Sequence, residues 1–421
     1  MRIVYLNSCG KLGGSETSLR EVLRSIRAAA PDWDLWLVLG EDGPLADIAR
    51  DLEVQVVLRP FPPALGRLGD SGAGSAGWNL LRAAGATAGY VHGLSGLLRE
   101  IKPDIIHSNA LKMHLLGAWA RPRGTPLLWH IHDYVSTRRL MSRFLRLSGR
   151  ACSMAIANSK SVARDLETLF PNLRTVPIYN AIDLGRFSPT GNTIDLDGAA
   201  GLPPAPSGTI RVGLVATFAR WKGHKVFLEA LSRLDSKVPV RGYIIGGPIY
   251  QTDGSQWSLK ELEQARDQLG LGGKVGFTGF LDEADAAMRS LDIVVHASTQ
   301  PEPFGMVIIE AMACGKAVIA SQAGGASELF DDGENAVGHP PGDAGALANQ
   351  IRRIAYDATL RGRLGTQARA TAERHYDGRR LATELRAAYE LASRWGSARL
   401  LRPNAAGPEL AAPASRRTGD P

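Results

Sequence analysis

The chain has 421 residues, which is more than one ordinary domain needs. Of these residues 44% are hydrophobic and 22% charged, a composition that excludes a disordered protein. No stretch approaches the roughly 18 uninterrupted apolar residues of a membrane span. The formal net charge of +7 is concentrated in two segments, 137–150 and 398–421. We therefore expect no binding of nucleic acid, which would require a wider spread of positive charge.

Short β-rich runs alternate with helical patterns from the first residues onward, which predicts βαβ units and parallel sheets. The first run turns polar at Asn7, too early for a secretory leader, and the three cysteines are scattered, so we expect a cytoplasmic protein with buried thiols. Residues 59–89 are rich in Gly, Pro and Ala and are expected to include a mobile loop. The strands expected in this half are 2–6, 35–39, 54–58, 104–107, 127–131 and 154–157.

A Gly- and Pro-rich segment without periodicity, 188–208, predicts a linker between two domains. Strand patterns resume after it at 210–216, 242–245, 274–277, 292–295 and 317–320. We therefore divide the chain into a first Rossmann-like domain (1–187), the linker, a second Rossmann-like domain (209–375), a final helix (376–397) and a disordered tail (398–421). In such doubly wound α/β domains, ligands bind at the carboxyl ends of the strands.

The first strand is followed by a glycine-rich turn, NSCGKLGGSE (7–16). Glycine lets a ligand approach the backbone, and the start of the next helix offers free N–H groups to a phosphate. The spacing is neither G-x-G-x-x-G nor a P-loop, which argues against a dinucleotide or NTPase site. A plain tight turn capped by Ser15 explains the stretch equally well in isolation.

The corresponding junction in the second half, TFARWKGH (217–224), carries two cations directly after a strand. Arg220 offers a planar fork and Lys222 a point charge, a combination that suits the diphosphate of a leaving group. A solvated basic turn is the alternative if this stretch is considered alone.

Two glutamates lie eight positions apart in PEPFGMVIIEAM (301–312). The flanking prolines keep Glu302 in a loop, whereas Glu310 falls inside a helix. A continuous helix would separate the two by about 12 Å, more than the roughly 5–9.5 Å of a hydrolase acid/base pair. We therefore expect the carboxylates to hold two parts of one extended ligand. Phosphate oxygens would bind between them at the helix start, formed by Phe304, Gly305, Met306 and Val307.

The segment PEPFGMVIIEAMACGKAVIASQAGGASELFDDGENA (301–336) resembles the signature of retaining GT-B glycosyltransferases of family 4, whose E-x7-E motif is matched by Glu302 and Glu310. Three more stretches, ATFARWKGH (216–224), GGSE (13–16) and PIYNAID (177–183), resemble further motifs of that family, so the likeness extends to about residue 395. It implies two Rossmann-like domains facing a cleft, a nucleotide-diphosphate-sugar donor, and retention at the anomeric carbon. It also implies that the final helix crosses back to the first domain.

The resemblance further implies roles for individual residues. It places Glu302 on hydroxyls of the donor sugar, Glu310 on the ribose and Lys222 on the diphosphate. The backbone near Phe280 and Leu281, in the stretch GFTGF (276–280) and just after it, would lie beside the base.

On the side of the first domain, the resemblance places Gly14 near the diphosphate, and Asn180 belongs to the turn that ends this domain. Two positions depart from the family pattern. Ala181 replaces a usual glycine in that turn, and Thr217 stands where many members carry an arginine. We therefore expect Arg220 to supply the second cation.

No D-x-D motif falls at a strand end, since DWD (32–34) lies at a strand start and DLD (195–197) in the linker. We expect no metal ion and no cofactor, because Lys222, Arg220 and backbone N–H groups can neutralise a leaving diphosphate. No nucleophile for a double displacement is evident. The resemblance implies front-face attack, in which the departing phosphate takes the proton of the acceptor.

A histidine, His132, follows the strand predicted at 127–131, where a side chain can enter the cleft. By resemblance it matches a position near the reacting sugar, so His132 and Glu302 are the candidate catalytic residues, and Asp133 could orient the imidazole. Asn109, just past the strand at 104–107, is a candidate on the acceptor side.

The segment 137–150, TRRLMSRFLRLSGR, holds five arginines and no acid. Its apolar side is expected to consist of Leu140, Met141, Phe144, Leu145 and Leu147. A basic amphipathic helix of this kind can lie on an anionic membrane or contact a lipid-diphosphate acceptor. A helix packed on its own domain, with solvated arginines, is the alternative.

Together these features predict a metal-independent, retaining hexosyltransferase. Its donor would be a nucleotide-diphosphate-sugar, and its acceptor a glycan or a lipid-linked molecule, with peripheral contact at the inner face of the cell membrane. The alternative is a GT-B-fold nucleotide-sugar epimerase or hydrolase, which needs acid/base groups converging on the sugar. A non-enzymatic two-domain binding protein would usually be exported. The sequence leaves the sugar, the base, the acceptor and the oligomeric state open.

Overall fold

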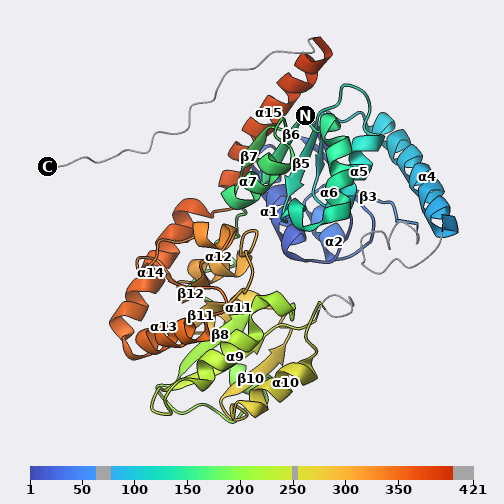
Figure 1. The fold of residues 1–421 in the computed structure, drawn as a ribbon. Coiled ribbons are helices and arrows are strands. Elements are labelled where there is room, and N and C mark those ends of the chain that lie inside the picture. Colours follow the sequence, from blue (N-terminus) through green and yellow to red (C-terminus); the bar gives the residue numbers. More distant parts are fainter. Residues whose placement is uncertain (63–76, 249–254, 402–421) are drawn as a thin grey trace.

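The computed structural model describes residues 1–62, 77–248 and 255–401. They form two parallel β-sheets in two domains, each sheet covered by helices on both faces (Figure 1). This confirms the predicted α/β class with two doubly wound, Rossmann-like domains. Among the described residues, no helix combines the length and the apolar character needed to cross a lipid bilayer.

The first sheet has seven strands in the order β3-β2-β1-β4-β5-β6-β7. The strand order reverses between β1 and β4, so the loops after these two strands diverge and leave a crevice at the carboxyl edge. The strands are β1 (Arg2–Asn7), β2 (Asp34–Leu39), β3 (Gln55–Leu58), β4 (Ile105–Ser108), β5 (Leu127–Ile131), β6 (Met154–Ala157) and β7 (Thr175–Pro177). The helices are α1 (Gly14–Ala29), α2 (Pro44–Asp51), α4 (Gly77–Ile101), α5 (Leu111–Ala120), α6 (Arg139–Ser148) and α7 (Lys160–Leu169), with short 3-10 turns η1 (Val135–Thr137) and η2 (Gly149–Ala151).

The second sheet has six strands in the order β10-β9-β8-β11-β12-β13, and its order reverses between β8 and β11. The strands are β8 (Ile210–Val215), β9 (Val240–Ile245), β10 (Val275–Gly279), β11 (Ile293–His296), β12 (Ala317–Ser321) and β13 (Val337–His339). The helical segments are α8 (Leu196–Ala199), η3 (Arg220–Lys222), α9 (His224–Ser232), α10 (Leu259–Gln268), α11 (Ala284–Arg289), α12 (Met306–Ala313), η4 (Gly325–Glu328), α13 (Ala344–Tyr356) and α14 (Ala358–His375).

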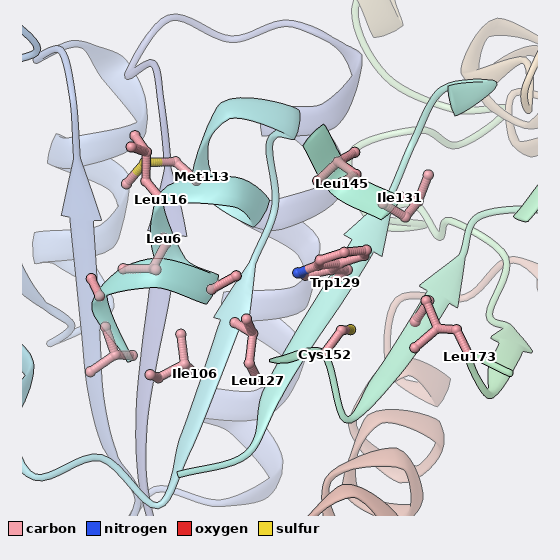
Figure 2. Close-up of a cluster of buried hydrophobic side chains, with 14 of the residues drawn as sticks. Leu6, Ile106, Met113, Leu116, Leu127, Trp129, Ile131, Leu145, Cys152 and Leu173 are labelled. Carbon is pink, nitrogen blue, oxygen red and sulfur yellow. The ribbon is translucent and has the colours of Figure 1, made fainter. Parts of the chain in front are cut away.

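Both faces of the first sheet are buried, as the alternation along β1 requires. Val4 and Leu6 point into one core, under α4, α5, α6 and α7, whereas Ile3 and Tyr5 point into the other, under α1 and α2. Figure 2 shows the first of these cores, in which Trp129 of β5 is fully buried. Strands buried on both faces read as continuous apolar runs, which is why they are recognisable in the sequence.

The last helix, α15 (Arg380–Leu401), leaves the second domain and packs against α1 of the first (Figure 1). Its buried side chains, among them Leu385 and Tyr389, complete the core under α1 and α2. The two segments that connect the domains run side by side: the N–H of Ile182 donates to the carbonyl of Tyr376 at 2.8 Å, and the N–H of Gly378 donates back to Ile182 at 3.0 Å.

Three segments differ from the sequence-based expectation. The segment 59–89, expected to include a mobile loop, is helical from Gly77 onward, where α4 begins, and residues 63–76 lie outside the described residues. The segment 188–208 contains α8, whose Leu196 is buried in the core of the second domain. Helix α15 continues to Leu401, so the first residues of the predicted tail are helical, and 402–421 lie outside the described residues.

Candidate functional site

In the first domain, the carboxyl ends of β1, β4 and β5 carry a network of polar side chains. The side-chain amide of Asn109 donates to Asn7 Oδ1 at 3.3 Å and to the carbonyl of Ser15 at 3.2 Å. Asn7 in turn donates to Glu16 Oε1 at 3.2 Å. These contacts join the glycine-rich turn and the start of α1 to the loop after β4, so they fix the floor of the crevice.

His132 is held by this network. Its Nε2 lies 2.8 Å from Asn109 Oδ1, and because the amide nitrogen of Asn109 is already used as a donor, Nε2 of His132 must carry the proton. Burial lowers the pKa of His132 to about 4, so the ring is neutral at pH 7. Nδ1 is then left as a hydrogen-bond acceptor with no partner among the described residues.

The polar network changes two of the predicted assignments. Asn109, predicted on the acceptor side, is 1% exposed, and its side-chain oxygen and nitrogen both form hydrogen bonds within the protein. The prediction that Asp133 orients His132 is wrong, because Asn109 does so, while the half-exposed Asp133 carboxylate lies 4.0 Å from Arg138. Asn180 is buried, with its Oδ1 accepting from Ser18 Oγ at 2.8 Å.

In the second domain, the basic turn after β8 approaches β11 very closely. Gly223 has φ of 80°, and a Cβ there would lie 1.9 Å from the carbonyl oxygen of Ala297, so only glycine fits. This close approach brings Lys222 to Glu302, and the two form an ion pair. Arg220 lies differently: its guanidinium stacks 3.8 Å from the ring centre of Trp257 and pairs with Glu261 at 3.1 Å.

Glu302 is 6% exposed, and both of its carboxylate oxygens have partners. Lys222 contacts Oε1, while His296 Nε2 at 2.8 Å and Ser298 Oγ at 2.5 Å contact Oε2. Burial opposes ionisation, but the Lys222 ammonium and His296 outweigh it and hold the pKa of Glu302 well below its usual range. Glu302 is therefore a carboxylate at any pH at which the protein would work.

Glu310 has the opposite character. It lies on α12, and no hydrogen bond or ion pair to its carboxylate occurs among the described residues. Burial raises the pKa of Glu310 to about 7, although Arg20 from the first domain and Arg186 oppose the shift. A carboxylate with unused acceptor sites, facing two cations, is ready to receive hydroxyl donors of a ligand.

The start of α12 lies between the two glutamates. Gly305 has φ of 106° and caps the helix without a side chain, which leaves the first backbone N–H groups, those of Met306 and Val307, for an anion. Phe304 is buried beneath this turn. A small pocket at the ends of β8 and β11 is lined by nine residues, Leu214, Val215, Ala216, Lys222, Val295, His296, Ala297, Ser298 and Val307.

Beyond this pocket, the ring of Phe280 follows β10 and is 57% exposed. A Cβ on Gly247 would lie 2.8 Å from that ring, so the glycine makes room for it. The neighbouring Leu281 packs on the core of the second domain. An exposed aromatic ring and the nearby backbone form a flat surface of the kind on which a base can rest.

The two domains touch through the loops that carry His132 and Glu302. The hydroxyl of Tyr134 donates to the carbonyl of Glu302 at 3.2 Å and accepts from the N–H of Gly325 at 3.3 Å. The carboxylate of Glu328 accepts from the first two N–H groups of α7, those of Lys160 at 2.9 Å and Ser161 at 2.6 Å. These contacts bring the loops after β5 and β6 of the first domain against the loops after β11 and β12 of the second.

Two family models match the chain. The model described as Glycosyltransferase Family 4 matches residues 12–186, and the model described as Glycosyl transferases group 1 matches residues 203–371, so together they span most of both domains. The chain is a GT-B glycosyltransferase of family 4.

Known relatives agree with this assignment. This glycosyltransferase is 28% identical over 65% of its length to the lipopolysaccharide core biosynthesis glycosyltransferase LpsE of Rhizobium meliloti, of which 72% is covered. It is 39% identical to the phosphatidyl-myo-inositol mannosyltransferase of Mycobacterium leprae, over 32% of this chain and 37% of that protein. HepE of Anabaena, solved in complex with UDP and glucose, superposes with a TM-score of 0.73 at 27% identity, over 92% of this chain and 99% of HepE.

Sequence reasoning missed the side chains of the glycosyltransferase that hold named site residues in place or join the two domains. They are Asn7, Tyr134, His296, Ser298 and Glu328. The first four share one signal, a polar residue at or just past the end of an apolar strand. Glu328 lies at the end of η4 and not at the end of a strand, and its partners belong to the other domain, so no sequence pattern indicates its role.

Proposed function

We propose that the protein transfers a hexose, with retention and without a metal ion, from a nucleotide-diphosphate-sugar to a glycan or lipid-linked acceptor. The observation that carries this proposal is the arrangement around the start of α12. Lys222 and the free N–H groups of Met306 and Val307 suit a diphosphate, and the unpaired Glu310 suits a ribose diol. Phe280 supplies a surface for the base. The UDP and UDP-glucose complexes of HepE make a UDP-sugar the first donor to test.

The ionisation of the two central residues supports transfer over hydrolysis or epimerisation. A general acid must carry a proton near neutral pH, but Glu302 is held ionised and His132 neutral. Both can accept hydrogen bonds from sugar hydroxyls, and neither is suited to protonate a leaving group. The departing diphosphate, neutralised by Lys222, is left to take the proton of the acceptor hydroxyl.

The test is a screen of UDP-, GDP-, ADP- and TDP-sugars by thermal shift and by slow donor hydrolysis, with EDTA present throughout. One donor should raise the melting temperature of the protein and be hydrolysed slowly. If the sugar of that donor is α-linked, retention predicts that the sugar is released as the α-anomer. No response to any donor would contradict the proposal. An epimerised nucleotide-sugar would instead favour the alternative reaction.

Glycine at position 14 is explained by a ligand better than by the fold. A Cβ at Gly14 would meet no atom within 4 Å, and its φ is not positive. Gly14→Ala should therefore leave the melting temperature unchanged but lower kcat/KM by about 10–100-fold, because the methyl group would displace the donor. Gly362→Ala, on α14 and equally unobstructed, is the matched control and should keep full activity. Equal activity of the two variants would show that no ligand approaches Gly14.

Donor affinity should depend on the ionisation of Glu310. With a pKa of about 7, its carboxylate is about 9% ionised at pH 6 and about 91% at pH 8, so affinity for UDP-glucose should rise about tenfold between these values. The diphosphate of UDP-glucose does not titrate in this range. Isothermal titration calorimetry of the wild type and of Glu310→Gln tests this, since the variant should bind weakly with no slope. A slope retained in the variant would assign the titration to another group.

Part of the apolar side of α6 is not covered by the protein. Met141 and Leu145 pack inward, but Leu140, Phe144 and Leu147 are exposed, the last to 82%. The exposed Trp119 of α5 lies beside the end of α6, where its indole N–H donates to Ser148 at 3.1 Å. Exposed apolar and aromatic side chains between arginines favour peripheral contact with an anionic membrane, where a lipid-linked acceptor would be found.

Changing Arg139, Arg143 and Arg146 to glutamine should lower cosedimentation with vesicles containing anionic phospholipid by about tenfold or more, because each cation near the surface contributes about 1 kcal/mol. The matched control changes three exposed arginines of α13 and α14, Arg353, Arg363 and Arg374, which removes the same charge from another face. An equal loss in both variants, or no loss in the first, would leave α6 without a membrane role.

A further inference from the structure

The carboxylate of Glu302 is bound asymmetrically by its own domain. Oε1 meets one donor, the ammonium of Lys222. Oε2 meets two, Nε2 of His296 at 2.8 Å and the hydroxyl of Ser298 at 2.5 Å. An ionised carboxylate offers about two acceptor sites per oxygen, so Oε2 is saturated while Oε1 retains one open site.

The protonation of His296 follows from its second nitrogen. The backbone N–H of Ser321 donates to Nδ1 at 3.3 Å, so Nδ1 is an acceptor and the ring proton lies on Nε2, which points at Glu302. His296 is 4% exposed and stands at the end of β11 beside β12. The second donor is anchored from the same strand, because Ser321 Oγ donates to the carbonyl of Ser298 at 2.7 Å. His296 is therefore part of the sheet, and Ser298, two residues past the end of β11, is tied to β12.

Lys222 is held less firmly than these donors. It belongs to a turn, its side chain is 20% exposed, and it lines the pocket at the start of α12. A diphosphate in that pocket would draw the ammonium away from Oε1 by its greater negative charge. Glu302 would then swing freely unless Oε2 were held by other groups.

We infer that the two oxygens of Glu302 have separate tasks: His296 and Ser298 are positioning residues that fix Oε2, and Oε1 alone serves the ligand. Without a ligand Oε1 is held by Lys222; when the donor binds, its diphosphate draws Lys222 away and Oε1 accepts from one hydroxyl of the donor sugar. This inference rests on the proposed function. It limits Glu302 to recognising the sugar through one oxygen, in one orientation.

Three substitutions separate positioning from simple packing. His296→Leu removes the donor to Oε2, His296→Gln retains an N–H donor and a carbonyl acceptor, and Ser298→Ala removes the second donor with little change in volume. His224→Leu is the control, because His224 is fully buried in the same domain and neither ring nitrogen has a hydrogen-bond partner among the described residues. Should His296→Leu not fold, Ser298→Ala and His296→Gln still decide the matter.

The first measurement is the titration of the Glu302 carboxyl by 13C NMR of protein labelled at the glutamate side-chain carboxyls, with the signal assigned by its absence in Glu302→Gln. The ionisable side chains that face Glu302 are Lys222, His296 and, from the first domain, Asp133, and of these three only His296 is replaced in any variant. The pKa of Glu302 should rise in His296→Leu and Ser298→Ala, stay low in His296→Gln, and not move in His224→Leu. An unchanged pKa in both donor-deleting variants would overturn the inference.

The second measurement is turnover. His296→Leu should lower kcat about 10–100-fold with donor affinity changed less than about threefold, because a misplaced carboxylate loses the reacting geometry but not the nucleotide contacts. His296→Gln should recover most of the loss, and equal losses in the two variants would contradict positioning. If the wild type turns over no nucleotide-sugar, the proposed function fails, while the NMR titration still decides whether His296 and Ser298 hold Oε2.

Discussion

Replacing Glu302 with alanine is expected to lower kcat by about three orders of magnitude while the affinity for UDP changes less than about threefold. The carboxylate is buried and ionised, and its partners Lys222, His296 and Ser298 line the small pocket in which we propose that the diphosphate binds, so its loss should remove contacts to the sugar and not to the nucleotide. Initial rates with saturating donor, together with calorimetric titration of UDP, give the two quantities.

Glu334→Ala is the control for this experiment, because Glu334 is an exposed carboxylate of the same domain. Its rate should equal that of the wild type. Turnover retained by Glu302→Ala would remove Glu302 from the reaction. A parallel loss of UDP affinity would mean that its main task is to hold Lys222.

Replacing Lys222 with methionine should impair both binding and chemistry. Lys222 is the cation that lines the pocket at the start of α12, so the variant should bind the donor about 10–100-fold more weakly. The rate should fall by a further factor of about 100, because negative charge develops on the leaving diphosphate in the transition state. Calorimetry and single-turnover kinetics separate the two losses.

Lys225→Met and Arg220→Met are matched controls, since both cations stack on Trp257 and Arg220 also pairs with Glu261. They should lose less than about tenfold in kcat/KM. A loss at Arg220 as large as that at Lys222 would instead favour the sequence-based expectation that Arg220 is the second cation on the diphosphate.

The fold could be predicted from the sequence wherever an element carries its own pattern. Strands such as β1 and β5 are buried on both faces, and their five or six residues are mostly apolar. The edge strands β7 and β13 have three residues each, too few for a pattern, and they were not predicted. Helix α4 was not predicted, because the glycines of its first half suggested a loop and the helical spacing of its buried Tyr90, Leu94 and Leu98 lies in its second half.

The site could be predicted as a set of positions but not as a set of contacts. Lys222, Glu302 and Glu310 were found because each follows a strand end within a motif. Which groups pair with Glu302 depends on the register of β8, β11 and β12, and the sequence does not contain that register in readable form. Asn109 illustrates the same limit: its position beside the crevice was predicted, but its use in fixing His132 follows only from the three-dimensional contacts.

The crossing of α15 onto the first domain has a consequence for synthesis on the ribosome. Leu381, Leu385 and Tyr389 cover apolar residues of α1 and the first sheet, yet they are translated only after the whole second domain. Domains usually fold in the order in which they emerge. Here the first domain keeps one apolar face open until the second domain and α15 have been translated, so nascent chains that stall before α15 would expose that face to chaperones and to one another.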